Sequence, residues 1–209
     1  MANITFDKII EIARGYCGRY EPVTTSILID LKEKFRDAYC ASKVHHDYKG
    51  GLMDHTKEVV DLCFSISNIY YDDIDMDLLI SGAILHDIGK IFTYEEVSGG
   101  KADKTYIGEL EEHLYVGAEL INEYRDKVET KLDLSLLKHM ILSHHGKREW
   151  GSPVTPRTRE AYILHQCDLL SARMVTFNKK IEENKKEGLF TSKDDFIGGK
   201  IFKGVQNER

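Results

Sequence analysis

The chain has 209 residues, of which 42% are hydrophobic, and a formal net charge of −6 at pH 7. This composition is sufficient for one sizeable core, and its acidic balance argues against nucleic-acid binding through a broad basic surface. Because no apolar run reaches membrane-spanning length and no signal-peptide pattern opens the chain, we expect a cytoplasmic protein with no membrane partner.

Apolar spacing predicts helices along most of the first half of the chain. A helix is expected over 24–35, where capping residues follow Pro22, and another over 51–70. Asp75 is expected to cap a third helix that runs to His86.

The second half continues this pattern with one interruption. An irregular β-hairpin is expected between Phe92 and Gly108, formed by 94–97 and a segment over 104–107. Asp133 is expected to cap a helix over 134–145.

The longest helix is expected to start after Pro153 and Pro156 and to end near Glu187. Its apolar residues recur at alternating intervals of four and three, which predicts a continuous buried stripe. The stripe consists of Ile163, Cys167, Leu170, Met174, Phe177 and Ile181. The predicted fold class is therefore all-α, a helical bundle with a small β-hairpin.

Histidines and aspartates lie beside the apolar faces of separate predicted helices. They are His55, His86 with Asp87, His113, the pair His144 and His145, and Asp168. Helices of a bundle direct such side chains inward, so these residues suffice for a site with two metal ions. Imidazole and carboxylate suit iron, manganese, nickel, cobalt or zinc, and two divalent ions would leave the site positive enough for an anionic substrate.

Each of these residues has a simpler interpretation when it is taken singly. A lone histidine beside an apolar face is more often a hydrogen-bonded core residue or a surface residue than a ligand. An adjacent His–Asp is also a common charge pair at a helix end. The distribution of the series over several helices is what favours a metal site.

The four cysteines form no CxxC pair and are expected to be buried, reduced thiols.

Three segments, HHDYKGGLMDHT, LHDIGK and LKHMILSHHGKREWGSPVTP, carry a family resemblance. The chain resembles the HD-domain metal-dependent phosphohydrolase superfamily and, within it, the HD domain of the YhaM-type 3′→5′ exoribonucleases. The resemblance extends from about residue 45 to the end, including FIGGKIFKG. It implies an HD-domain helical bundle and a water, activated by two metals, that attacks phosphorus.

The resemblance also implies a ligand set. One metal would be held by His55, His86, Asp87 and Asp168, and the other by Asp87, His113, His144 and His145, so that Asp87 bridges the two. The expected cofactors are two divalent ions, such as iron, manganese or nickel.

We expect a single HD domain over residues 1–209. It would comprise N-terminal helices over 1–44, a metal-binding helical core over 45–186 and a tail over 187–209 packed on that core. YhaM-type enzymes carry an OB-fold domain ahead of the HD domain. The residues before the motif here are too few and too helical for a five-stranded barrel, so we expect this chain to lack it.

Lys90 is the remaining catalytic candidate beside Asp87. It follows Asp87 by three residues, about one helical turn, so its ammonium can point at the same space and meet a phosphate oxygen or the leaving group. The alternative is a solvated lysine that ends a helix.

Other polar residues have weaker assignments. His46 and Tyr48 are candidates for substrate contact, as are Lys147 and Arg157 near the SHHGK loop. A surface or packing role is the alternative for each of them. His139 is interpreted as structural, and His165 as a partner that orients Asp168.

Three functional hypotheses follow. The first is a phosphohydrolase or phosphodiesterase acting on a nucleotide or short oligonucleotide, with a small-nucleotide phosphatase or cyclic-nucleotide phosphodiesterase as its near alternative. The second is an HD-type di-iron oxygenase, which the adjacent pair at 144–145 disfavours because the oxygenases use one histidine there. The third is a non-catalytic binding module, which the complete ligand set disfavours. No stable binding of double-stranded nucleic acid is expected, and the oligomeric state stays open.

Overall fold

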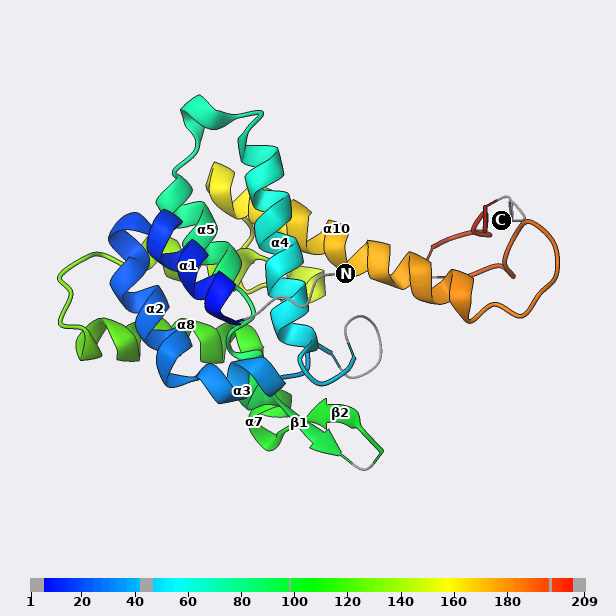
Figure 1. Ribbon diagram of the computed structural model, residues 1–209, viewed down its shortest axis with the longest axis horizontal. Coiled ribbons are helices and arrows are strands. Elements are labelled where there is room, and N and C mark those ends of the chain that lie inside the picture. Colours follow the sequence, from blue (N-terminus) through cyan, green and yellow to red (C-terminus); the bar gives the residue numbers. More distant parts are fainter. Residues whose placement is uncertain (1–5, 42–46, 98, 196, 205–209) are drawn as a thin grey trace.

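The computed structural model describes residues 6–41, 47–97, 99–195 and 197–204. These residues form a bundle of helices with one two-stranded antiparallel sheet, so the predicted fold class is confirmed (Figure 1). Within this part of the chain, no helix is both long and apolar enough to cross a bilayer.

Three helices precede the first histidine ligand candidate: α1 (Phe6–Tyr16), α2 (Glu21–Asp30) and α3 (Lys32–Asp37), with the 3-10 turn η1 (Gly18–Tyr20) after α1. The prediction of one helix over 24–35 is wrong in two respects. The helix begins at Glu21, because Pro22 fits a first turn, where its missing N–H costs nothing. It also breaks at Leu31, whose φ of −100° and ψ of 13° are not helical.

The next two helices are α4 (Gly51–Ser67) and α5 (Met76–Leu85), joined through the 3-10 turn η2 (Tyr71–Asp73). The prediction of α4 is confirmed, although the helix ends at Ser67. Asp75 caps α5 as predicted, because its carboxylate accepts a hydrogen bond from the Leu78 N–H at 3.2 Å.

A short helix, α6 (Lys90–Thr93), leads into the hairpin of β1 (Tyr94–Val97) and β2 (Lys101–Lys104), in which Tyr94 pairs with Lys104. The helices α7 (Tyr106–Leu110) and α8 (Glu112–Lys127) follow. The predicted second strand over 104–107 is therefore wrong in its position. The Thr105 hydroxyl accepts a hydrogen bond from the Gly108 N–H at 3.0 Å, and this cap starts a helix where a strand was expected.

The last helices are α9 (Ser135–Ser143) and α10 (Arg159–Glu182), with the 3-10 turn η3 (Arg148–Trp150) between them. Asp133 is not the N-cap residue of α9 that was predicted, because Leu134 occupies that position. The Asp133 carboxylate nevertheless accepts a hydrogen bond from the Ser135 N–H at 2.9 Å. The helix α10 ends before the predicted Glu187.

The buried face of α10 differs from the predicted stripe. Leu170 and Met174 are 45% and 52% exposed, whereas Ile163 and Cys167 are buried as expected. The buried positions 160, 164, 167 and 171 lie at helical intervals and mix polar with apolar residues, so a count of apolar residues alone misplaces this face.

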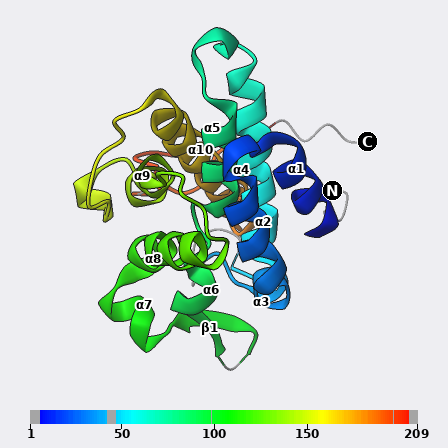
Figure 2. The same ribbon diagram turned by 90° about the vertical axis from the view of Figure 1, so that its left-hand side faces the viewer.

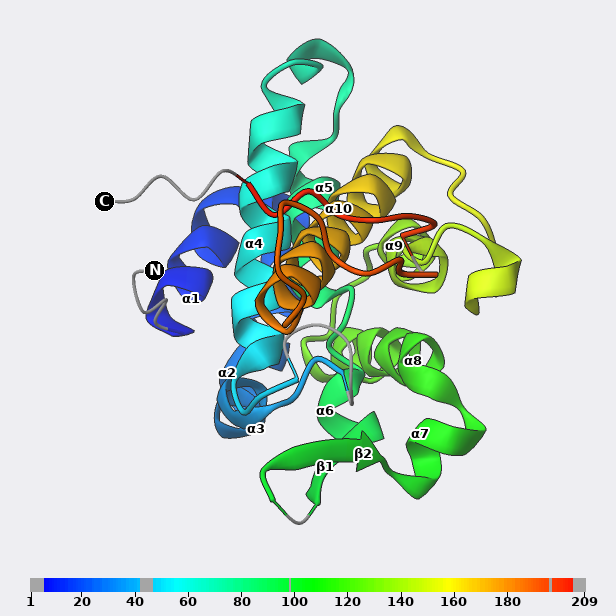
Figure 3. The ribbon, with the colours of Figure 1, turned by 90° about the vertical axis from the view of Figure 1, so that its right-hand side faces the viewer.

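The helix α5 forms the centre of the bundle. All its residues from Leu78 to Leu85 are buried, and it packs against α1, α4, α9 and α10. Figure 2 shows α8 and α9 packed together, and Figure 3 shows α10 crossing α4. The ends of several of these helices therefore meet near the end of α5.

The described residues of the tail, 187–195 and 197–204, lie at the C-terminal end of α10 (Figure 1). Lys180 of α10 forms an ion pair with Asp194 at 2.8 Å, and the rings of Phe190 and Phe202 lie 5.4 Å apart. The four cysteines are buried and free of disulfides, as the sequence predicts.

Candidate metal centre

Five helices bring the predicted ligands to one place. The residues are spread over these five helices: α4 supplies the first histidine, the end of α5 a His–Asp pair, the start of α8 another histidine, the end of α9 two histidines, and α10 an aspartate. In chain order these are His55, His86, Asp87, His113, His144, His145 and Asp168. All seven predicted ligands therefore converge.

The Asp87 carboxylate lies between two sets of imidazoles. Its Oδ2 is 3.5 Å from His55 Nε2 and 3.3 Å from His86 Nε2. Its Oδ1 is 3.3 Å from His113 Nε2 and 3.5 Å from His144 Nε2. Each oxygen of this one carboxylate thus faces a different pair of ring nitrogens.

Among the described residues, there are three groups whose ligand atoms lie within 4.8 Å of one another, and two of these groups flank the Asp87 carboxylate without including it. The first group is His55, His86 and Asp168, and the second group is His113, His144 and His145. In the first group, Asp168 Oδ1 is 3.1 Å from His55 Nε2. The arrangement offers one cluster of donors on each side of Asp87.

Hydrogen bonds from Nδ1 to backbone carbonyls orient three of these imidazoles. His86 donates to the Ala83 carbonyl at 2.9 Å, and His144 to the Ile141 carbonyl at 2.7 Å. His145 donates to the carbonyl of Trp150 at 2.8 Å. When Nδ1 donates, Nε2 keeps its lone pair, which is the state that a metal requires.

His55 is oriented from α10. Its Nδ1 lies 3.1 Å from the Ser171 hydroxyl, which itself donates to Glu58 at 2.8 Å. Ser171 therefore accepts from His55, and the buried polar position on α10 has a function in placing this ring.

Burial and charge set the protonation of the site. Burial lowers the pKa of His55 and of His144, and burial with the neighbouring histidines lowers that of His145 to about 3. Burial alone would raise the pKa of Asp87, but the charge of Lys90 and the imidazole contacts hold it well below its usual range. The pKa of His86 moves the other way, because burial is outweighed by the charge of Asp87, which raises it. The site thus favours the neutral form of His55, His144 and His145 beside the ionised Asp87 carboxylate.

Several buried polar atoms of the site make no hydrogen bond to the described residues. Asp87 Oδ1 and both ring nitrogens of His113 make no hydrogen bond within the described residues. The Nε2 atoms of His55 and His86 lie 3.2 Å apart, although two lone pairs facing each other repel. Because buried polar groups are normally satisfied, these residues fit divalent metal ions.

Lys90 reaches the same centre from the first turn of α6. Its side chain is buried, and Nζ lies 2.6 Å from Asp87 Oδ2 and 3.5 Å from Cys40 Sγ. Burial lowers the pKa of Lys90, but attraction to Asp87 raises it by more, so the net direction is upward. The predicted position of Lys90, facing the ligands, matches this geometry.

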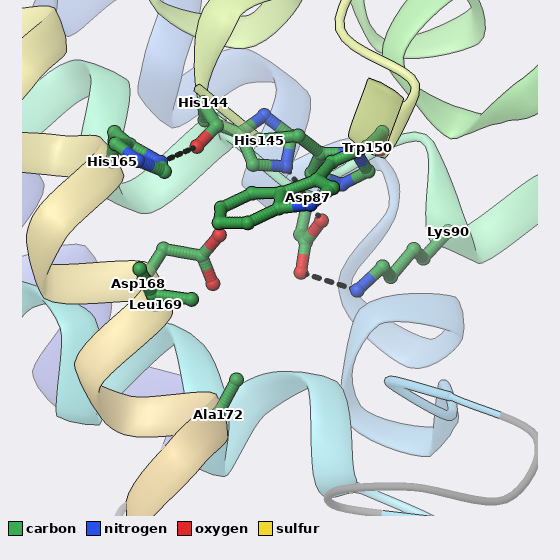
Figure 4. A pocket seen from close by; sticks show the side chains of 9 residues that line it. All are labelled: Asp87, Lys90, His144, His145, Trp150, His165, Asp168, Leu169 and Ala172. Atoms are coloured by element: carbon green, nitrogen blue, oxygen red, sulfur yellow. Dashed lines mark hydrogen bonds and ion pairs between the residues drawn. The ribbon is translucent and has the colours of Figure 1, made fainter. Parts of the chain in front are cut away.

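A cavity of about 200 Å³ adjoins the ligands (Figure 4). Its lining consists of Asp87, Lys90, His144, His145, Trp150, His165, Asp168, Leu169 and Ala172. The cavity gives a small substrate access to the Asp87 carboxylate and to both ligand groups.

Sequence reasoning missed two residues of this centre. Cys40 is fully buried with Sγ 3.8 Å from Asp87 Oδ2, and nothing in the sequence indicates this contact across 47 positions. Trp150 lines the cavity, and here a signal existed. It is the single tryptophan of the chain, and it lies in a glycine-flanked loop five residues after His145.

The four residues predicted to contact the substrate do not converge as the predicted ligands do. His46 lies outside the described residues. Tyr48 is 45% exposed and donates to Asp54 at 2.7 Å. Lys147 is exposed and its Nζ lies 4.5 Å from the centre of the Trp150 ring. Arg157 is also exposed, outside the set of residues that line the cavity.

Two further histidines have structural contacts. His139 Nε2 accepts from the Arg157 backbone N–H at 2.9 Å, in keeping with its structural interpretation. His165 donates from Nδ1 to the His144 carbonyl at 2.8 Å. This hydrogen bond of His165 is thus not the predicted one to Asp168. His165 instead supports the turn that carries the second group.

The fold and the site agree with a comparison of protein families. The family model described as HD domain matches residues 52–173, and the chain belongs to the HD-domain family.

The chain is also similar to the protein named 3′-5′ exoribonuclease YhaM of Listeria monocytogenes, in serotype 4b strain F2365 and in serovar 1/2a. It is 36% identical to each over 166 residues, which cover 78% of this chain and 51% of the relative. The chain thus spans about half the length of the curated relatives it matches. No solved structure matches the chain.

Proposed function

We propose that this protein is an HD-domain hydrolase that cleaves a phosphoester bond of a nucleotide or short oligonucleotide with the help of two divalent metal ions. The position of Asp87 carries the proposal, because its two oxygens face two separate groups of ligands. The first group with Asp87 would hold one ion, and the second group with Asp87 would hold the other. Bound ions supply Lewis acidity and lower the pKa of a bound water toward about 7.

Lys90 is the proposed partner of the phosphate. Its Nζ lines the cavity beside the Asp87 carboxylate, so it can donate a hydrogen bond to a phosphate oxygen that enters there. A buried cation stabilises negative charge that develops on the phosphoryl group or on the leaving oxygen.

The charge of the site suits an anionic substrate. Asp87 and Asp168 contribute two negative charges and Lys90 one positive charge, and two divalent ions make the sum positive. A chain with a net charge of −6 therefore presents a local positive centre inside the cavity. Attraction of phosphate is confined to this place.

The similarity to the Listeria exoribonucleases favours the 3′ end of a short RNA as the substrate. The match covers 78% of this chain. It is therefore longer than the segment from His55 to Asp168 that contains the ligands. We therefore place oligonucleotides ahead of free or cyclic nucleotides.

The test compares product release from short RNAs, mononucleotides and cyclic nucleotides in the presence of Mn²⁺. Wild type should shorten RNA stepwise from its 3′ end. Asp87→Asn, which keeps the side-chain shape but removes the charge, should lower the rate roughly 10²- to 10³-fold. The control Asp126→Asn changes a carboxylate that is 73% exposed and should behave like wild type.

Full activity of Asp87→Asn would contradict the proposal. Hydrolysis of mononucleotides or cyclic nucleotides alone would replace the oligonucleotide by a small substrate. Two bound irons without any release of phosphate or nucleotide would favour the oxygenase hypothesis.

A further inference from the structure

The cavity beside the ligands has two chemically different walls. One wall consists of ligands and Lys90, whereas Trp150, Leu169 and Ala172 supply apolar surface (Figure 4). A phosphate group uses only the polar wall. The apolar wall fits a substrate that carries a flat, weakly polar group next to its phosphoester.

Trp150 is the largest side chain of the apolar wall, and the residue is 41% exposed. The Nζ of Lys147 lies 4.5 Å from the ring centre, so a cation accompanies the indole. An exposed indole beside a cation offers stacking for a base and attraction for its phosphate.

The loop that carries this indole is held by backbone hydrogen bonds. The N–H groups of Trp150 and Ser152 both donate to the Lys147 carbonyl, at 3.1 Å and 3.2 Å. The Trp150 carbonyl accepts from His145 at 2.8 Å, which ties the loop to the second ligand group. The backbone that carries the indole is therefore tied to the second ligand group before any substrate binds.

We propose that Trp150 is the stacking surface for the nucleobase adjacent to the scissile phosphate. This inference rests on the proposed function and deepens it, because it names the part of the substrate that the apolar wall recognises. Stacking accepts every base, since each has a π-face, so the site selects a nucleotide end without selecting its sequence. Lys147 contacts the neighbouring phosphate.

The first test measures kcat and KM for a short RNA and for the same RNA with an abasic 3′-terminal residue. Trp150→Ala should lower kcat/KM for the complete RNA by about tenfold, mainly through KM, and should leave the abasic RNA unaffected. Trp150→Phe should restore part of the loss. Neither change removes the backbone carbonyl that accepts from His145.

The control variant is Tyr106→Ala, which removes an aromatic side chain that is 80% exposed on α7. It should match wild type with both RNAs.

The second test uses fluorescence, because Trp150 is the single tryptophan of the chain. A phosphorothioate RNA that resists hydrolysis should quench the emission of the Mn²⁺-loaded wild type, and its abasic counterpart should not. This readout requires binding but no turnover, so it separates the stacking inference from the proposed function.

Loss specific to the complete RNA, together with base-dependent quenching, supports the inference. If Trp150→Ala loses the same activity on both RNAs, the role of Trp150 is merely structural and the inference is overturned. The inference is also overturned if wild type cleaves RNA but Trp150→Ala has unchanged kinetics and the RNA does not quench the emission of wild type. Quenching by the complete RNA in a protein that cleaves no phosphoester would overturn the proposed function and support the stacking surface. Absence of both quenching and phosphoester cleavage would overturn the stacking inference and the proposed function together.

Discussion

The two ligand groups on either side of Asp87 differ in how the fold supports them. The first group lies on α4, α5 and α10, which pack against one another in the centre of the bundle. Its histidines are fully buried, and both have an Nδ1 partner. The second group lies at the start of α8 and the end of α9, next to the loop that carries Trp150. His113 has no hydrogen-bond partner among the described residues.

The groups also differ in charge. The first group adds the Asp168 carboxylate to that of Asp87, whereas the second group adds only imidazoles. Backbone geometry points the same way, because Glu112, directly before His113, has a φ of 61° that costs energy for a residue other than glycine. We therefore expect the first group to hold its ion more tightly than the second.

The largest effects should come from removing one histidine of each group. Both His86→Gln and His113→Gln should lower hydrolysis by roughly 10²-fold or more, because the proposed reaction uses both ions. They should differ in metal content after dialysis. His113→Gln should keep one ion per chain, held by the first group, whereas His86→Gln should lose the tighter ion.

Elemental analysis measures this difference. The control His139→Gln keeps an acceptor for the Arg157 N–H and should retain both ions. Two ions retained by His113→Gln, or equal losses in the two variants, would contradict the unequal support of the groups.

Lys90→Met should separate metal binding from turnover. Both ions should remain, because Lys90 is not a ligand, and kcat should fall by roughly 10²-fold as a donor to the phosphate is lost. Steady-state kinetics on protein of known metal content checks this. Lys101→Met, an exposed change on β2, serves as the control. Unchanged kcat would remove Lys90 from the reaction.

A smaller effect should come from Gly89, which separates the end of α5 from α8. A Cβ at this position would lie 2.1 Å from the His113 carbonyl oxygen and 2.8 Å from the Gly117 nitrogen. Gly89→Ala should therefore lower the free energy of unfolding by about 1–3 kcal/mol and weaken the second group first.

Urea unfolding measures this change against a matched glycine. Gly15 lies on α1, and a Cβ added there would meet nothing within 4 Å, so Gly15→Ala should raise stability by up to about 1 kcal/mol. Equal effects of the two substitutions would show that the close approach at Gly89 has no energetic consequence.

Local signals in the sequence account for much of the fold and for the convergence of the ligands. Asp75 marks the start of α5, and the length of its apolar run places His86 and Asp87 at the end of that helix. A helix end of this kind directs its last side chains toward its neighbours. The position of each ligand candidate beside an apolar face therefore predicted that these seven side chains point inward.

Contacts between distant segments were beyond such reasoning. The buried face of α10 includes Ser171 because that residue orients His55, and an apolar count excludes it. His165 donates to the His144 carbonyl because α9 and α10 pack together, which no spacing within α10 reveals. Trp150 faces the cavity through the hydrogen bonds of its loop.

The central claim is that one carboxylate serves two metal ions. Elemental analysis of wild type and of Asp87→Asn, loaded with Mn²⁺ and then dialysed, tests it most directly. We predict about two ions per chain in wild type and loss of at least one from the variant, with the second group emptied first. One ion in wild type, or two ions retained by Asp87→Asn, would contradict the account.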